Sequence, residues 1–158
     1  MTGKIAVGGI TRTDDLVLVR ILGASAGHDL SGRALTALGN QNINVTCVTS
    51  FLDKDRLNNM CFAVEADHLD QTLGILQSLE DDIQARSIEY QLRCSAVSIY
   101  GPHFSERPAI AGRVFDTIGE AGVEVLMIST SFSTVSFVTN EDQAVLAVTK
   151  LNSVFLVP

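Results

Sequence analysis

A helix-like pattern followed by a strand-like pattern stands out at residues 110–132. Four apolar residues recur there at helical spacing and would share one face of a helix: Ile110, Val114, Ile118 and Ala121. Gly122 follows where a helix commonly ends, because glycine adopts the left-handed cap conformation without steric cost. Residues 123–128 are apolar on both faces except for Glu124, which predicts a central, buried strand.

The same pattern occurs once earlier in the chain. Four residues of the first copy reappear in the second at a constant offset (113 − 33 = 80): Gly32, Arg33, Gly39 and Val45 return as Gly112, Arg113, Gly119 and Val125. A fixed long offset indicates a duplicated supersecondary unit. The sequence therefore predicts two copies of one small α+β module.

Each copy shows the order of elements expected for such a module. Copy one reads strand, helix, strand, strand, helix, strand, over about residues 16–22, 29–41, 43–51, 60–64, 67–79 and 87–92. Copy two repeats the first five elements over about residues 96–100, 108–121, 123–128, 134–139 and 140–151, where Asn140 and Gln143 resemble a capping box. Residues 13–15 read as a polar turn, and residues 154–157 as a marginal last strand.

A short apolar segment at residues 5–10 has no counterpart in the repeat. Copy two also lacks a convincing fourth strand. The economical interpretation is that residues 5–10 pair into the sheet of copy two, so that copy one is inserted into copy two. The expected units are residues 14–93, and residues 1–13 together with 94–158.

Composition restricts the classes of function. The chain has 158 residues, 46% of them hydrophobic, and a net charge of −7. The acidic balance argues against a nucleic-acid partner, which would need a basic face. No apolar run approaches the ~20 residues that span a bilayer, and the N-terminus lacks the pattern of a signal peptide, so no membrane partner is expected and the cytoplasm is the expected compartment. The cysteines, Cys47, Cys61 and Cys94, are expected to be reduced thiols.

Catalytic chemistry finds little support in the sequence. No glycine-rich phosphate loop carries a lysine, and no set of acids is arranged for Mg²⁺. Ser129, Thr130 and Ser131 form a polar run without a histidine and aspartate placed as partners. We therefore expect no catalytic residues, no metal and no cofactor in this chain, which leaves open whether it belongs to an enzyme as a non-catalytic part.

Several short motifs resemble the tandem ACT domains of aspartate kinase (aspartokinase), in particular its separately translated regulatory subunit. They are Gly9-Ile10-Thr11, Asn42-Ile43-Asn44-Val45, and Ile128-Ser129-Thr130-Ser131 followed by Glu141-Asp142. The resemblance covers nearly the whole chain. It implies two ferredoxin-like βαββαβ units with antiparallel sheets and helices on one face, the first unit inserted into the second. It also implies an allosteric module that senses lysine or threonine and controls a kinase of aspartate-family (lysine) biosynthesis.

The resemblance also implies an effector site between ACT units of two subunits. It falls on the loop before the first helix and on the second strand of each copy: Ala26, Gly27, His28, Asp29, Asn44, Val45, Thr46, Ser50, Glu124, Val125, Leu126 and Ser129. Acidic residues usual in the family fall here on Ala26 and Thr46. A second interpretation is therefore an ACT-fold interaction or scaffold protein that has lost effector binding.

The acids that remain for an ammonium group are Asp29 and Glu124. The alternative for Asp29 is a plain helix cap, and Glu124 could simply reach solvent from a strand end. His28 and His103 occupy equivalent loops and are read as exposed loop residues rather than ligands.

A homodimer is the expected assembly. Each βαββαβ sheet has helices on one face only, so its other face and its edges need cover, and small units gain core by associating. We expect copy one of one subunit to face copy two of the other. The expected partners are thus a free amino acid, a second copy and a kinase catalytic domain or subunit.

Overall fold

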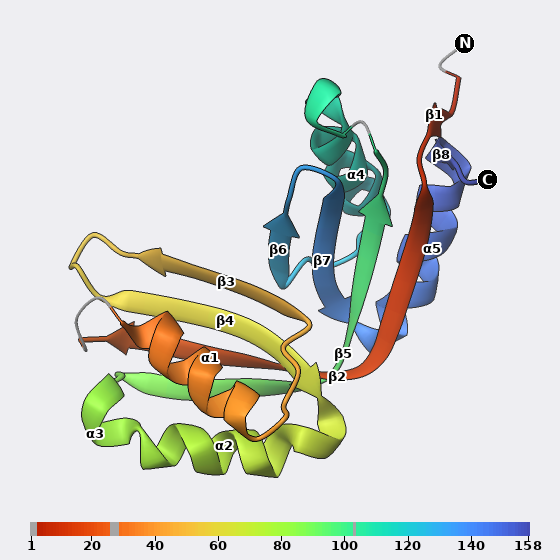
Figure 1. The fold of residues 1–158 in the computed structure, drawn as a ribbon. Coiled ribbons are helices and arrows are strands. Elements are labelled where there is room, and N and C mark those ends of the chain that lie inside the picture. Colours follow the sequence, from red (N-terminus) through yellow and green to blue (C-terminus); the bar gives the residue numbers. More distant parts are fainter. Residues whose placement is uncertain (1–2, 26–28, 103) are drawn as a thin grey trace. The chain divides into compact units, whose positions relative to one another are not determined.

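The computed structural model describes residues 3–25, 29–102 and 104–158. The chain divides into two compact units (Figure 1). The insert unit comprises Asp15–Leu92, and the outer unit comprises Met1–Asp14 together with Arg93–Pro158. Each boundary lies one residue inside the expected range 14–93.

The insert unit packs its helices against one face of an antiparallel sheet. Its elements are the second half of β2 (Gly9–Ala24), α1 (Leu30–Asn40), β3 (Cys47–Leu52), β4 (Asn58–Glu65), η1 (Ala66–His68), α2 (Leu69–Ser78), α3 (Glu80–Ile83) and the first half of β5 (Ser87–Tyr100). β4 pairs antiparallel with both β2 and β3. Val19 and Phe62 on the sheet meet Leu38 and Leu76 on the helices in one buried core.

The outer unit repeats this design. Its further elements are β1 (Ile5–Ala6), η2 (Phe104–Glu106), α4 (Ala109–Glu120), β6 (Met127–Thr130), β7 (Thr134–Asn140), α5 (Glu141–Val154) and β8 (Phe155–Leu156). β7 pairs antiparallel with β5 and β6. Val97 and Phe137 on the sheet pack against Ile118 and Leu151 on the helices. The predicted α+β class, with antiparallel sheets and helices on one face, is confirmed.

Two strands are longer than the sequence pattern predicts. The expected polar turn at residues 13–15 is wrong, because β2 runs without a break from Gly9 to Ala24. The expected separate strands at 87–92 and 96–100 are likewise one strand, β5. Asp15 and Arg93 stand where these strands pass from one unit to the other, with φ of 56° and 57°. A single residue in the left-handed region does not end a strand, whereas a short polar run in the sequence resembles a turn.

The segment at residues 5–10 forms two elements rather than one. Ile5 and Ala6 (β1) pair in parallel with Phe155 and Leu156 (β8), and Val7 N–H donates to the Leu156 carbonyl over 3.0 Å. β2 then begins at Gly9. The segment therefore pairs with residues of the outer unit.

The apolar stretch at residues 123–128 is not a central strand. β6 begins only at Met127, and it is the last strand in the order β3-β4-β2-β5-β7-β6. Val123 owes its burial to the helix-covered core, where it lies in the connection after α4. In the same way Ile43 is buried, although β3 begins at Cys47. Buried connections thus produced the continuous apolar pattern that predicted longer strands.

Candidate functional site

The half of the predicted site in the insert unit lies where α1 begins beside β3. Ser31 in the first turn of α1 donates a weak hydrogen bond, 3.5 Å long, from its Oγ to the Oγ of Ser50 on β3. Asn44, Thr46 and Ser50 are exposed, and Val45 is half-buried. The predicted contacts Ala26, Gly27 and His28 lie outside the described residues, as does His103.

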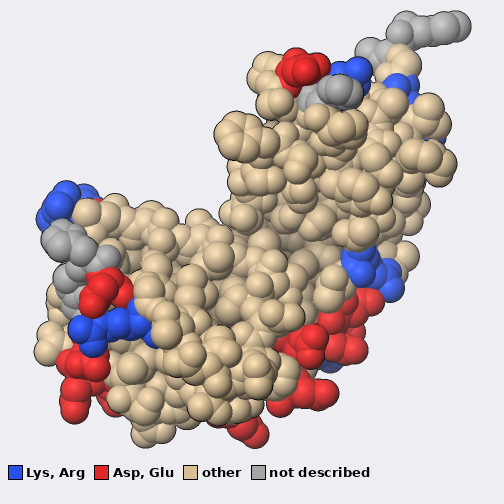
Figure 2. All heavy atoms as spheres, viewed as in Figure 1, with Lys and Arg blue, Asp and Glu red and all other residues tan. Residues whose placement is uncertain are grey.

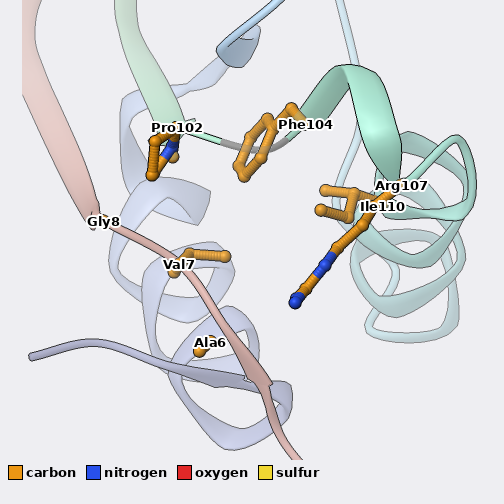
Figure 3. A pocket seen from close by; sticks show the side chains of 8 residues that line it. Ala6, Val7, Gly8, Pro102, Phe104, Arg107 and Ile110 are labelled. Carbon is orange, nitrogen blue, oxygen red and sulfur yellow. The ribbon is translucent and has the colours of Figure 1, made fainter.

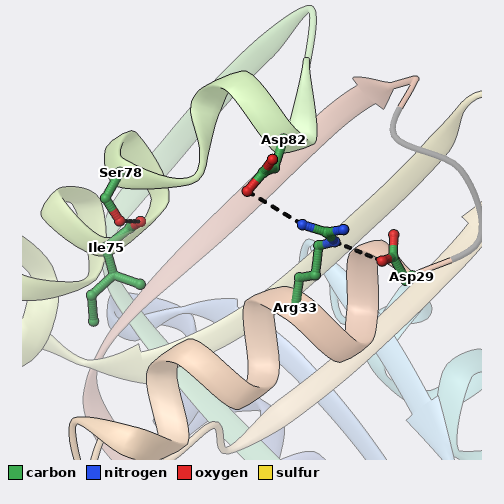
Figure 4. A network of polar contacts seen from close by, with 5 residues as sticks. All are labelled: Asp29, Arg33, Ile75, Ser78 and Asp82. Atoms are coloured by element: carbon green, nitrogen blue, oxygen red, sulfur yellow. Dashed lines mark hydrogen bonds and ion pairs between the residues drawn. The ribbon is translucent and has the colours of Figure 1, made fainter.

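Asp29 forms an ion pair and does not cap its helix. It occupies the position before α1, but its side chain makes no capping hydrogen bond. Its Oδ2 instead accepts from Arg33 Nε at 2.6 Å, and Arg33 Nη1 lies 3.3 Å from Asp82 Oδ2 (Figure 4). The hydrogen bond that Arg33 donates to Asp29, and then the charges of Asp29 and Asp82, raise the pKa of Arg33. A ligand ammonium at Asp29 would therefore share the carboxylate with Arg33.

The half of the site in the outer unit centres on Glu124. Thr139 Oγ1 donates to the Glu124 carbonyl at 2.7 Å, and Glu124 N–H donates to Gln143 Oε1 at 3.0 Å. Asn140 Nδ2 donates to Glu124 Oε2 at 3.1 Å. The predicted capping box is wrong, because Asn140 makes no side-chain cap and both amides hold residues 122–124 instead. The spacing of Asn140 and Gln143 suits a helix cap as well as this network, so the sequence did not reveal that they position Glu124.

This network leaves Glu124 suited to bind a cation. The residue is exposed, so the expectation that it reaches solvent is met. One carboxylate oxygen already accepts from Asn140, which restricts its rotation. A carboxylate has about four lone-pair sites, so further acceptors remain for an ammonium group.

The remaining predicted residues of the outer unit follow Glu124, two of them directly and one, Ser129, on β6. Val125, Leu126 and Ser129 are half-buried. Ser129 stands opposite Ser136 on β7, whose Oγ lies 2.7 Å from the Oγ of Ser98 on β5. This polar row crosses three strands on the face away from the core.

The strands that carry or follow the predicted site residues, β3 and β6, are also the two ends of the order of the six-stranded sheet. Large apolar side chains are exposed on or beside them: Val48 (39%), Phe51 (60%), Leu52 (45%), Ile128 (44%) and Phe132 (87%). Edge strands with exposed apolar side chains are sites where another chain pairs. The polar site residues and this apolar edge thus coincide in both units.

Comparison with known protein families matches residues 97–155 to the ACT domain. These residues belong to the ACT domain family. The match covers β6, β7, both α-helices of the outer unit and the last four residues of β5. The ACT family assignment drawn from the sequence motifs is confirmed.

Relatives of the whole chain are aspartate kinases. The chain is 29% identical to Aspartokinase 2 of Bacillus subtilis over 98% of its own length, and it spans 38% of that protein. A chain of a crystal structure of aspartokinase alpha and beta subunits is 28% identical, with a TM-score of 0.84 and coverage of 94% of this chain and 98% of that one. The regulatory subunit of aspartate kinase from Thermus thermophilus shares the fold, with a TM-score of 0.86 at 20% identity, over 96% and 99% of the two chains.

Other classes of site find no support in the part of the chain that the structure describes. None of its helices has the length and apolar character needed to cross a membrane. Its His, Cys, Asp and Glu side chains form no group of three or more that could hold a metal ion. On the face in Figure 2, basic side chains form only small, separate groups.

A polar network that the sequence analysis missed joins the β3–β4 turn to the end of β2 in the insert unit. Gly23 N–H donates to Asn59 Oδ1 at 3.0 Å, and Asn59 Nδ2 donates to Asp53 Oδ2 at 3.1 Å. Asp53 Oδ1 also accepts from the N–H groups of Asp55 and Leu57. The network ties the β3–β4 turn to the end of β2, just before the loop that precedes α1. An aspartate that bonds the backbone two residues later is a recognisable turn signal, and could have been found.

Ionised Asp53 should stabilise the fold above pH 4. The Leu57 N–H and then the Asn59 amide hold the pKa of Asp53 below its ordinary value, against an opposing effect of burial. The Asp55 N–H and the charge of Arg86 lower it further, each by less. A lowered folded-state pKa contributes stability above the unfolded-state pKa of about 3.9. That stability is lost as the pH falls through the folded-state pKa.

We therefore expect Asp53→Asn to lower the melting temperature by a few degrees at pH 7, and the deficit to shrink between pH 4 and pH 2. Thermal unfolding followed by circular dichroism across this range measures it. Asp55→Asn is the matched control, since Asp55 gives the turn its backbone N–H, and it should leave the melting temperature nearly unchanged. A deficit for Asp53→Asn that is constant with pH would contradict the electrostatic explanation.

Proposed function

We propose that this chain is an allosteric regulatory module of an aspartate kinase. It binds a small amino acid of the lysine or threonine class where the insert unit of one copy meets the outer unit of another. The observation that carries this proposal is the 28% identical chain of the aspartokinase alpha and beta subunit structure, because the two chains cover nearly all of each other. Each compact unit would then be one complete ACT unit, and the kinase catalytic part would be the partner that the module controls.

The chemistry of the two half-sites supports an amino-acid ligand. The ammonium group needs an acid, and Glu124 offers a positioned, exposed carboxylate. The ligand carboxylate needs donors, and the first turn of α1 with the hydroxyls of Ser31 and Ser50 supplies them. Acid and donors lie in different units, so the complementary groups of one ligand come together when the half-sites face each other.

The apolar edges support a dimer that brings the half-sites together. β3 and β6 are both edge strands, and each carries exposed apolar side chains such as Phe51 and Ile128. In a two-fold dimer, β3 of each copy meets β6 of the other, so the same contact forms twice. This arrangement would cover both edges and create two equivalent effector sites.

A scaffold function without an effector is the second candidate. The family's usual acids are replaced by Ala26 and Thr46. Asp29 is already paired with Arg33. If these replacements abolished effector binding, the dimer through β3 and β6 would still form, but no amino acid would stabilise the chain.

Thermal-shift measurements with each of the twenty amino acids separate the two candidates. At one hundred times its dissociation constant, a specific effector stabilises by about 2.7 kcal/mol, which corresponds to about 5–10 °C for a chain of this size. We expect Glu124→Ala to abolish that shift, because it removes the acid that pairs with the ammonium. Glu120→Ala, an exposed acid at the end of α4, is the matched control and should retain the shift.

Two outcomes of these thermal-shift measurements would count against the proposed effector site. The absence of a shift with any amino acid favours the scaffold function. A shift that survives both Glu124→Ala and Asp29→Ala would overturn the proposed ligand chemistry.

A further inference from the structure

We propose that the outer unit holds a second binding site for a 2-oxo acid, a small monoanionic carboxylate with a branched apolar tail. It is distinct from the shared edge, the effector site proposed where β3 of one copy meets β6 of another. The site is a cavity of about 320 Å³ between the β1–β2 junction and the start of α4. Its lining includes Ala6, Val7, Pro102, Phe104, Arg107 and Ile110 (Figure 3). The volume lies at the small end of the range for ligand pockets and suits a molecule of amino-acid size.

The walls of the cavity are fixed by backbone contacts. Gly8 N–H donates to the Tyr100 carbonyl at 2.7 Å, and Gly101 N–H donates to the Ser133 carbonyl at 2.9 Å. A Cβ on Gly101 would stand 2.7 Å from a ring carbon of Phe104, so only glycine lets the ring lie there. The cavity is therefore built into the fold, and a ligand would find it already formed.

The inner surface is apolar. Val7, Phe104 and Ile110 are 6%, 9% and 2% exposed, so each is held by the core while one side faces the cavity. An aliphatic tail placed between them would leave water for an apolar surface, which is favourable.

Arg107 gives the cavity its charge. Its side chain extends from the turn before α4 toward Ala6 and Val7, and places the guanidinium beside the cavity (Figure 3). A guanidinium pairs with a carboxylate through two parallel hydrogen bonds, which fixes the orientation of the ligand. An acid bound in this way would direct its tail toward Val7 and Ile110.

The lining also discriminates against amino acids. None of the described lining residues is an acid, so an ammonium group would enter without a counter-charge. A 2-oxo acid keeps the carboxylate and the branched tail but carries a neutral carbonyl in place of the ammonium. The shared edge has the opposite preference, because Glu124 there would attract an ammonium group. Every described residue that lines the cavity belongs to the outer unit.

Isothermal titration of the full chain with 3-methyl-2-oxobutanoate tests the site. We expect a dissociation constant on the order of 0.1–1 mM, as suits a ligand of this size. Valine, which differs by its ammonium, should bind at least about tenfold more weakly, and isobutanol, which lacks the carboxylate, should not bind measurably.

Two arginine variants make the test specific. Arg107→Gln should weaken binding of the 2-oxo acid by about tenfold or more, because it removes the charge-assisted pair. Arg113→Gln should leave it unchanged, since Arg113 lies on α4 and lines a different cavity. Because Arg107 is exposed, its replacement should not disturb the core.

The Glu124→Ala variant distinguishes binding in this cavity from binding at the effector site. That variant should bind the 2-oxo acid as the unmodified chain does. Absence of binding at 10 mM, equal binding of valine, or loss of binding in Glu124→Ala but not in Arg107→Gln would each overturn the proposal. A ligand that is lost in Arg107→Gln but not in Glu124→Ala occupies this cavity, and a ligand with the opposite pattern occupies the effector site, so failure of one proposal can be told from failure of the other.

Discussion

Replacing Phe137 with Ala should lower the free energy of unfolding of the outer unit by about 3–5 kcal/mol. Phe137 lies in the middle of β7 with no exposed surface, and its ring meets Phe115 edge to face with 6.0 Å between centroids. Removal of the ring loses apolar burial and the aromatic pair, and leaves a cavity that the antiparallel sheet cannot close. Urea unfolding followed by circular dichroism measures the change.

Phe132→Ala is the matched control for the same side chain in the opposite environment. Phe132 is 87% exposed in the turn between β6 and β7, so its removal should change the unfolding free energy by no more than about 0.5 kcal/mol at concentrations where the chain is monomeric. Equal losses for the two variants would contradict the assignment of the core of the outer unit.

The second large effect is expected at the proposed dimer edge. Ile128→Lys should raise the dissociation constant of the homodimer by more than about thirtyfold, because it buries a charge without a partner where β6 meets its neighbour. Ile128 is 44% exposed, so a lysine there is tolerated in the monomer. Sedimentation equilibrium over a range of concentrations measures both species.

Val145→Lys serves as the control on a surface outside this edge. Val145 is an exposed valine on α5, at 60%, and its replacement should leave the dimer unaffected. A monomer for the unmodified chain at high concentration would refute the shared-site arrangement. A dimer that tolerates Ile128→Lys but not Val145→Lys would move the interface from the sheet edge to α5.

The first experiment tests the core within one unit, and the second tests the association of two copies. The buried face of each ACT-like sheet supplies stability within one unit, whereas the edge strands remain available to a second copy. Effector binding at the shared edge would then stabilise the dimer, and a kinase catalytic part could respond to that change. The cavity beside Arg107 needs no second copy, which makes it a means of separating ligand binding from association.

The sequence by itself determined the helices and the repeated design. Periodic apolar positions predicted helices at 29–41 and 108–121, and the structure has Leu30–Asn40 and Ala109–Glu120. Helical periodicity is a local property, because residues three and four apart share a face whatever they pack against. The resemblance carried by short motifs added the ACT family, which no periodicity could reveal.

Only the tertiary structure decided how the strands are shared and which polar groups meet. β2 and β5 continue through Asp15 and Arg93, although the polarity there reads as a turn. The position of β6 at an edge depends on pairing with a strand that follows it, and an apolar run has the same appearance at an edge, in the centre or in a buried connection. The physical reason is that strand order and ion pairing join residues far apart in sequence.

The candidate site shows the same division. The sequence proposed Glu124 as an acid of the site but placed it within a strand, whereas β6 begins only at Met127. It did not show that Asn140 holds the Glu124 carboxylate, or that the surface acids paired with Arg33 are Asp29 and Asp82. It also gave no sign of the cavity beside Arg107, whose described lining combines residues 6–8 with residues 101, 102, 104, 107 and 110. Such contacts exist only once the chain has folded, because the burial of apolar surface, rather than any local motif, brings these segments together.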